Sequence, residues 1–215
     1  MKKWLMYIPM IILAILVFLV FNEPGPVWFF PIFVIAYFLR KHLSRLGNLN
    51  MKLITKYVIV GVIIGLAIEF LAIIATQSIP YGQRELFHQA PIPDLILALG
   101  YYATLMLGSY FILKRYKYSL KEFFILGGIF GLIFEAYGQV FLSVIQGNFL
   151  GGIYVFLSYS SLIALPYMIF EKEFEKDKTP KKSSKLKYIK SLLILALFHL
   201  IFLAYFIIVN PILGP

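Results

Sequence analysis

Two glutamates that lie in long apolar stretches are the residues of this sequence best suited to acid–base chemistry. Glu69 ends the stretch GVIIGLAIE (61–69), and Glu135 ends the stretch GGIFGLIFE (127–135), 66 positions later. A carboxylic acid in an apolar cavity can hold a proton and donate it to a reacting group. Two carboxyl groups that face each other can share one proton. We therefore expect Glu69 and Glu135 to act as a catalytic acid and its stabilising partner.

Polar side chains near the two glutamates extend this predicted site. On a continuous helix, Gln77 falls within about 80° of Glu69. By the same geometry, Gln139 and Gln146 fall within about 80° of Glu135, which predicts a polar stripe from Glu135 to the outer surface. We assign Gln139 to the catalytic group, as an orienting residue, and Gln77 and Gln146 to substrate binding.

His199, in the middle of the last apolar stretch, is the remaining catalytic candidate. It could relay protons to a glutamate or complete a Glu–Glu–His metal site, although the sequence lacks a ligand spacing such as HExxH. We expect no metal and no cofactor. Aromatic walls suit an extended π-system or a cation, so three tyrosines join the predicted substrate-binding group: Tyr101, Tyr102 and Tyr137.

Several of these residues also have a purely structural interpretation. Glu69, Glu135 and His199 can serve as hydrogen-bonded contacts between helices. Asp94 follows two prolines, and we expect it to cap the N-terminus of a helix. Glycines spaced four apart let helix backbones approach closely, so four glycines are assigned to helix packing: Gly61, Gly65, Gly127 and Gly131.

The composition is that of an integral membrane protein. Apolar residues make up 61% of the 215-residue chain, and charged residues only 14%. A soluble domain is closer to half apolar and a quarter charged. The net charge of +10 sits in short segments between apolar runs, which is a signal of membrane topology and not of nucleic-acid binding. The chain has no cysteine, so it can form neither disulfides nor thiolate metal sites.

Apolar runs predict a single all-α domain over residues 1–215, with seven transmembrane helices in a multi-pass protein of the cell membrane. Only Arg84 of the 20 basic residues falls on the outer side if the N-terminus is inside and the C-terminus outside. Residues 171–188 form a charged cytoplasmic linker. The predicted spans are residues 4–21, 27–39, 57–78, 94–113, 123–145, 151–170 and 189–209.

The duplicated motif predicts a parallel internal repeat of two helix pairs. The repeat units are about 57–113 and 123–170, and each begins with a helix that runs from inside to outside. Such units are related by an axis along the membrane normal. We therefore expect Glu69 and Glu135 at the same depth, about 16–18 Å above the inner edge of the apolar core.

The stretch from Gly65 to Tyr102 resembles the carotenoid-biosynthesis membrane proteins, which include bisanhydrobacterioruberin hydratases and lie near the small lycopene cyclases. Glu69, the turn Pro80-Tyr81-Gly82, Pro91, Pro93 and the pair Tyr101-Tyr102 carry the resemblance. Tyr81 replaces the family's phenylalanine, and the Pro-x-Glu-Glu motif of the cyclases is missing. The resemblance implies cofactor-free acid–base chemistry on a long polyene.

Three functions from different classes follow from these observations. The leading hypothesis is a membrane-embedded enzyme that hydrates, cyclises or isomerises a lipidic isoprenoid such as a carotenoid. The second is a proton-coupled transporter or channel that uses the glutamates as proton or cation sites. The third is a non-catalytic membrane assembly protein. The expected partners are membrane lipid or a lipidic substrate, and anionic lipid headgroups at the cytoplasmic basic loops. An oligomer is left open, and no nucleic-acid partner is expected.

Overall fold

The structure, a computed structural model, describes residues 8–21, 25–80, 86–176 and 186–214, and for Tyr137 the backbone only. Within these ranges the chain forms helices and no β-strand, so the prediction of an all-α fold is confirmed. The α-helices are α1 (Ile8–Val20), α2 (Phe29–Leu43), α3 (Leu53–Ala75), α4 (Pro91–Arg115), α5 (Leu120–Phe134), α6 (Gln139–Ile145), α7 (Phe149–Lys176) and α8 (Lys187–Val209). The 3-10 helices are η2 (Pro26–Trp28), η3 (Ser44–Asn48), η4 (Glu135–Gly138) and η5 (Asn210–Ile212).

Five helical segments in the described ranges are long and apolar enough to cross a membrane, and the bent pair α5–α6 raises this number to six if it counts as one span. The first predicted span is described over only 13 residues, as α1. The second is longer than expected, because η2, α2 and η3 form one helical run over Pro26–Asn48. Seven spans, the orientation of the termini and the internal repeat stay predictions.

The predicted continuous fifth helix over residues 123–145 is wrong. α5 ends at Phe134, and α6 leaves it at an angle of 94° after the 3-10 turn η4. Ala136 and Gly138 take positive φ angles of 47° and 86° inside this turn, a region that breaks a right-handed helix. The predicted polar stripe from Glu135 along one helix face therefore does not form.

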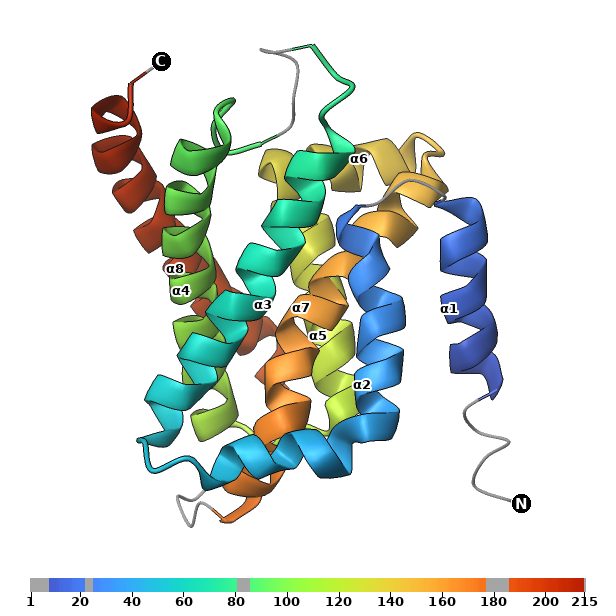
Figure 1. Cartoon of the computed structure of the whole chain (residues 1–215), viewed down its shortest axis with the longest axis vertical. Helices are drawn as coiled ribbons and strands as arrows, with labels where there is room; N and C mark the ends of the chain where they lie inside the picture. The colour runs from blue at the N-terminus through green and yellow to red at the C-terminus, as the bar shows by residue number, and fades with distance from the viewer. Residues whose placement is uncertain (1–7, 22–24, 81–85, 177–185, 215) are drawn as a thin grey trace.

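α7 is the most enclosed of the long helices. In its most apolar window, 72% of the residues are buried, whereas in α8 the share is only 11%. Figure 1 shows α7 in the middle of the bundle, between α2 and α3, and α8 at one edge beside α4. Small buried side chains such as Ser160, Ser161 and Ala164 let neighbouring helices approach α7 closely.

The helix ends rich in lysine and arginine lie at one end of the bundle, which we call the basic end. The last turns of α2 and α4 and the starts of α3, α5 and α8 meet there, at the bottom of Figure 1. α3 and α5 both run from this end to the opposite one. Glu69 lies 16 residues after the start of α3 and Glu135 lies 15 residues after the start of α5. Both are therefore about 22–24 Å along their helices.

Candidate functional site

The carboxyl group of Glu69 is buried between α3 and α4, where it meets a tyrosine. Glu69 is only 6% exposed, and the hydroxyl of Tyr102 donates a hydrogen bond of 2.8 Å to its Oε2. The ring of Tyr102 lies on Gly65, one helical turn before Glu69. A Cβ at position 65 would overlap this ring, so the close approach requires glycine.

Asp94 brings a second carboxyl group to Glu69. Its side chain is fully buried, its Oδ1 accepts the backbone N–H of His88 at 3.0 Å, and its carboxyl group lies close enough to that of Glu69 for the two to interact electrostatically. Oδ2 of Asp94 is buried and has no hydrogen-bond partner among the described residues. Two ionised carboxylates at such a distance repel each other, whereas a pair that holds one proton can share it in a hydrogen bond.

The expected capping role of Asp94 is wrong. α4 begins at Pro91 with Ala90 as its N-cap residue, so Asp94 falls inside the first turn. Proline fits the first turn of a helix because its missing N–H has no partner to lose there. The carboxylate of Asp94 faces the preceding loop and Glu69 and does not cap the helix.

Glu135 meets a tyrosine in the same way between α5 and α7. The hydroxyl of Tyr159 donates a hydrogen bond to Oε2 of Glu135. The ring of Tyr159 lies on Gly131, one turn before Glu135, and a Cβ there would come within 2.5 Å of the ring atom Cγ. The arrangement of glycine, tyrosine and glutamate seen on α3 therefore recurs on α5.

A hydrogen bond between two tyrosines links the contacts around Glu69 to those around Glu135. The hydroxyl groups of Tyr101 and Tyr159 lie 2.8 Å apart, and the rings of Tyr101 and Tyr102 meet edge to face at 5.2 Å. Because Tyr159 gives its proton to Glu135, Tyr101 is the donor in this bond. Both glutamates thus belong to one site, which we call the carboxyl–tyrosine cluster. Its members are Glu69, Asp94, Tyr101, Tyr102, Glu135 and Tyr159.

The matching contacts continue toward the basic end. A Cβ on Gly61 would overlap Met106, and a Cβ on Gly127 would lie 3.1 Å from Cβ of Ile163. One turn further, the rings of Tyr57 and Tyr110 lie 6.0 Å apart, and those of Phe123 and Tyr167 lie 5.2 Å apart. The pairs α3–α4 and α5–α7 therefore make contacts at equivalent positions over three helical turns.

His199 lies beside the cluster in an aromatic shell. Its ring centroid is 6.1 Å from that of Tyr101 and 5.9 Å from that of Phe134. Nδ1 of His199 is buried and has no hydrogen-bond partner among the described residues. The structure therefore places His199 close to the cluster without a hydrogen bond to either glutamate. No group of three metal-binding side chains occurs in the described ranges.

The predicted glutamines fall outside the cluster. Gln77 follows the end of α3, Gln139 begins α6, Gln146 follows its end, and all three are exposed. The bend after Glu135 directs α6 away from the axis of α5, which separates Gln139 and Gln146 from the glutamate. The side chain of Tyr137 and the residues Tyr81 and Gly82 lie outside the described part of the chain.

The sequence missed Asp94 and the pairing of Tyr159 with Glu135. Asp94 lies eight residues before Tyr102 on α4, a spacing that puts both side chains on one helix face. Glu135 follows Glu69 by 66 positions, whereas Tyr159 follows Tyr102 by only 57, so one alignment of the two units does not match both pairs. Aligning the second helix of each predicted unit separately from the first would have revealed Tyr102 and Tyr159 as equivalent residues.

An apolar groove opens on the bundle surface near Glu135. It has a volume of about 480 Å³, and its eight lining residues come from α1, α5, α6 and α7 and include Leu132, Gly152 and Phe156. Leu132 lies three residues before Glu135, and Phe156 three residues before Tyr159, so the groove is one helical turn from the cluster. No charged side chain lines it, which suits a hydrocarbon chain.

Comparisons with known proteins give no relative for this chain: no family model matches it, and neither curated proteins nor solved structures match.

Proposed function

We propose that the protein is a membrane-embedded enzyme that uses buried carboxylic acids for acid–base chemistry on a lipidic isoprenoid such as a carotenoid. The observation that carries this proposal is the carboxyl–tyrosine cluster. It holds three carboxyl groups and three tyrosine hydroxyls within the helix bundle, and two of the carboxyls, those of Glu69 and Asp94, lie close together. Ionisable groups inside a membrane protein are costly and mark functional sites by default.

In this proposal, the pair of Glu69 and Asp94 supplies the reacting proton. The protonated member transfers its proton to one carbon of a C=C bond, and the other carbon becomes a cation. Tyr102 stabilises the carboxylate that remains, because its hydroxyl already donates to Oε2 of Glu69. In a hydration, water attacks the cation and returns a proton to the carboxylate. In a cyclisation, an internal alkene attacks the cation and closes a ring, and the new cation loses a neighbouring proton to the carboxylate. In an isomerisation, the first cation loses a neighbouring proton to the carboxylate.

The apolar groove supports a lipidic substrate. Its volume of about 480 Å³ lies within the range of known ligand sites, and its position one turn from Glu135 would bring part of a long chain close to the acids. The resemblance of residues 65–102 to carotenoid-biosynthesis membrane proteins favours an isoprenoid over an acyl chain.

The test is production of the protein in cells that accumulate an acyclic C40 polyene, with the pigments separated and identified by mass spectrometry. We expect a hydrated, cyclised or isomerised product with the unchanged protein. Glu69→Gln should abolish the product, while the matched variant Glu175→Gln, an exposed glutamate near the end of α7, should retain it. Full activity of Glu69→Gln at equal protein levels would contradict the proposal.

Proton transfer across the membrane is a second candidate, and one specific observation favours it. Tyr101, Tyr159 and Glu135 form a continuous chain of hydrogen bonds that ends where α5 breaks. Broken helices inside membrane proteins often line ion pathways. Purified protein in liposomes that contain a pH-sensitive dye distinguishes the two candidates, because a transporter dissipates an imposed proton gradient and an enzyme leaves it intact.

A further inference from the structure

The segment of residues 87–90, just before α4, lies against the carboxyl–tyrosine cluster at the end of the bundle opposite the basic end. The backbone N–H of His88 donates to Oδ1 of Asp94 at 3.0 Å, and His88 itself is only 8% exposed. The ring centroid of Phe87 lies 5.3 Å from that of Tyr101. The segment therefore contacts the cluster at two of its members.

The side chain of His88 joins this segment to the chain that follows α8. The backbone N–H of Ala90 donates to Nδ1 of His88 at 3.0 Å, so Nδ1 carries no proton and the ring proton is on Nε2. Nε2 then donates to the carbonyl oxygen of Gly214, also at 3.0 Å. Gly214 has a φ of 86°, a left-handed conformation that favours glycine. One imidazole thus holds together two parts of the chain that are 126 positions apart.

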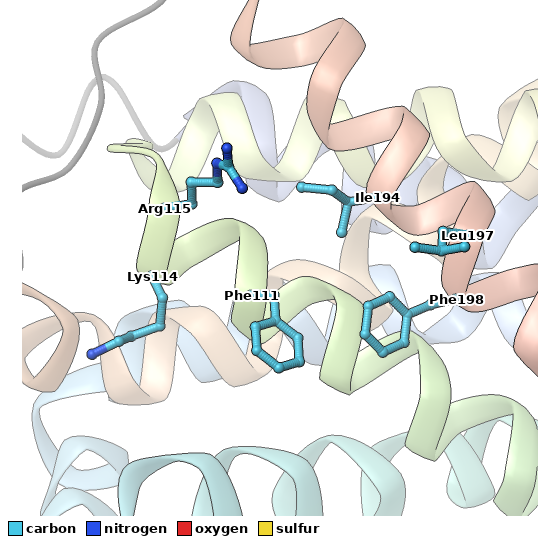
Figure 2. Close-up of a pocket in the computed structure, with 6 residues that line it drawn as sticks. All are labelled: Phe111, Lys114, Arg115, Ile194, Leu197 and Phe198. Atoms are coloured by element: carbon cyan, nitrogen blue, oxygen red, sulfur yellow. The ribbon is translucent and has the colours of Figure 1, made fainter.

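Packing of α8 on α4 brings the two ends of this contact together. A Cβ on Gly100 would overlap the ring of Tyr205, and the hydroxyl of Tyr205 donates to a backbone carbonyl of α4 at 2.9 Å. Further toward the basic end, the rings of Phe111 and Phe198 stack 5.7 Å apart, and Figure 2 shows them beside each other. Figure 1 shows the start of α4 and the end of α8 at the same end of the bundle. Helix packing therefore sets where the chain after α8 can meet the segment before α4.

We propose that His88 is a positioning residue of the acid pair, and that its bond to Gly214 is a latch that holds residues 87–90 over Asp94. The latch orients the carboxyl of Asp94 through the N–H of His88. It also keeps bulk water away from the pair, so that the proton of Glu69 and Asp94 is delivered to the substrate and not exchanged with solvent. The positioning role rests on the proposed function, whereas the closure of the segment does not.

Chemical modification of Asp94 tests the latch without any substrate. A water-soluble carbodiimide with glycine ethyl ester converts an accessible carboxyl group into an amide, and mass spectrometry of the peptides locates the product. The rate at Asp94 in purified protein is divided by the rate at Glu175, which is exposed near the end of α7 and serves as the internal reference. In the unchanged protein we expect Asp94 to react much more slowly than Glu175, because its side chain is fully buried.

Two substitutions of His88 separate its two side-chain hydrogen bonds. His88→Gln places an amide N–H near the position of Nε2, so it can still donate to Gly214. His88→Asn places an acceptor near the position of Nδ1 for the N–H of Ala90, but it is too short to reach Gly214. We expect His88→Asn to raise the rate at Asp94 about tenfold, the local opening that follows the loss of one hydrogen bond, and His88→Gln to retain most of the protection.

Gly214→Ala tests the other partner of the latch without changing the histidine. Gly214 and Gly147 have φ angles of 86° and 102°, and a Cβ on either would meet no atom within 4 Å, so the two alanine variants carry the same kind of backbone strain. Only Gly214→Ala moves a carbonyl that His88 binds. We expect Gly214→Ala to raise the rate at Asp94 about as much as His88→Asn does, and Gly147→Ala to leave it unchanged. The two effective substitutions together should add little, since both remove the same bond.

Two results would overturn the latch: full protection of Asp94 in both His88→Asn and Gly214→Ala, or equal loss of protection in Gly214→Ala and Gly147→Ala. Circular dichroism of each variant confirms that it is folded. In the pigment assay, His88→Asn should lower product formation and His88→Gln should retain it, and full activity of His88→Asn would reject the positioning role. The expected pattern of protection without any product from the unchanged protein would reject the proposed function alone.

Discussion

The carboxyl groups of Glu69 and Asp94 lie close enough to interact, although one belongs to α3 and the other to the first turn of α4. Asp94 is fully buried and Glu69 nearly so. Two ionised carboxylates in such a place would repel each other, so we expect the pair to share one proton and to carry one negative charge. The proton, and not either residue alone, is therefore the element of the site that substitutions should test first.

Asp94→Asn should keep the fold and remove the function. Asparagine is isosteric with aspartate, accepts the N–H of His88 through its amide oxygen, and donates to Glu69 through its amide nitrogen. It cannot share a proton with Glu69, so we expect product formation to fall by at least two orders of magnitude, the usual contribution of a general acid. Pigment analysis at equal protein levels measures this.

A purely structural cluster predicts the opposite for Asp94→Asn. An assembly protein with interhelical hydrogen bonds would retain its partners, its stability and its role. The variant Asp94→Leu, which removes every polar contact, should destabilise the protein under either function, so the contrast between the asparagine and leucine variants separates the two interpretations.

Removing the tyrosine hydroxyls should weaken the two halves of the cluster by similar amounts. Tyr102→Phe leaves Oε2 of Glu69 without its 2.8 Å donor, and Tyr159→Phe does the same to Glu135. Each substitution should lower the free energy of unfolding by about 1–3 kcal/mol, the cost of an unsatisfied buried group. Thermal unfolding in detergent, followed by circular dichroism, gives the comparison. A double-mutant cycle with Glu69→Leu, which removes the acceptor, should show a coupling above about 0.5 kcal/mol for Tyr102→Phe. A coupling near zero would mean that this hydrogen bond does not form.

Adding one methyl group at Gly65 or Gly131 should be costly. The new Cβ of Gly65→Ala overlaps the Tyr102 ring, and that of Gly131→Ala comes within 2.5 Å of the Tyr159 ring. Overpacking of this kind lowers the free energy of unfolding by about 1–3 kcal/mol. Gly108→Ala is the graded control, since its nearest atom is 3.1 Å away, and its melting temperature should fall less. Equal shifts in all three variants would argue against tight seating of the tyrosine rings.

The bend between α5 and α6 should respond to backbone substitutions in a predictable direction. Gly138 has a φ of 86°, and an alanine there should cost about 1 kcal/mol, because left-handed backbone crowds a Cβ. Ala136 has a φ of 47°, so Ala136→Gly should relieve strain and raise the melting temperature, the reverse of the usual effect of glycine in a helix. If residues 135–138 were helical, Gly138→Ala would raise the melting temperature and Ala136→Gly would lower it.

The sequence could predict the helices but only part of their geometry. Apolar runs fixed the approximate places of α3, α4, α7 and α8, because burial in lipid or in a bundle needs continuous apolar length. The helix break after Phe134 could not be predicted, because the apolar pattern of residues 123–145 continues through it without a proline. Gly138 is the one local sign, and a single glycine is tolerated in many helices.

Half of the cluster could be predicted for a similar reason. Glu69 and Glu135 stand out because charge is rare in apolar stretches. Asp94 does not, because a preceding pair of prolines makes an acid look like a helix cap. The partnership of Tyr102 with Glu69 spans 33 positions and depends on how α3 and α4 pack, which local periodicity does not determine.

The bond between Tyr101 and Tyr159 differs from the others in the cluster because it crosses from α4 to α7, whereas each tyrosine–glutamate bond stays within its own helix pair. A small rotation of one pair against the other would lengthen this bond first and leave both tyrosine–glutamate bonds intact. Each glutamate would keep the hydrogen bond from its own tyrosine, but the polar contact between the two helix pairs would be lost. The Tyr101–Tyr159 hydrogen bond is therefore the polar contact of the cluster that depends on how the two helix pairs sit against each other.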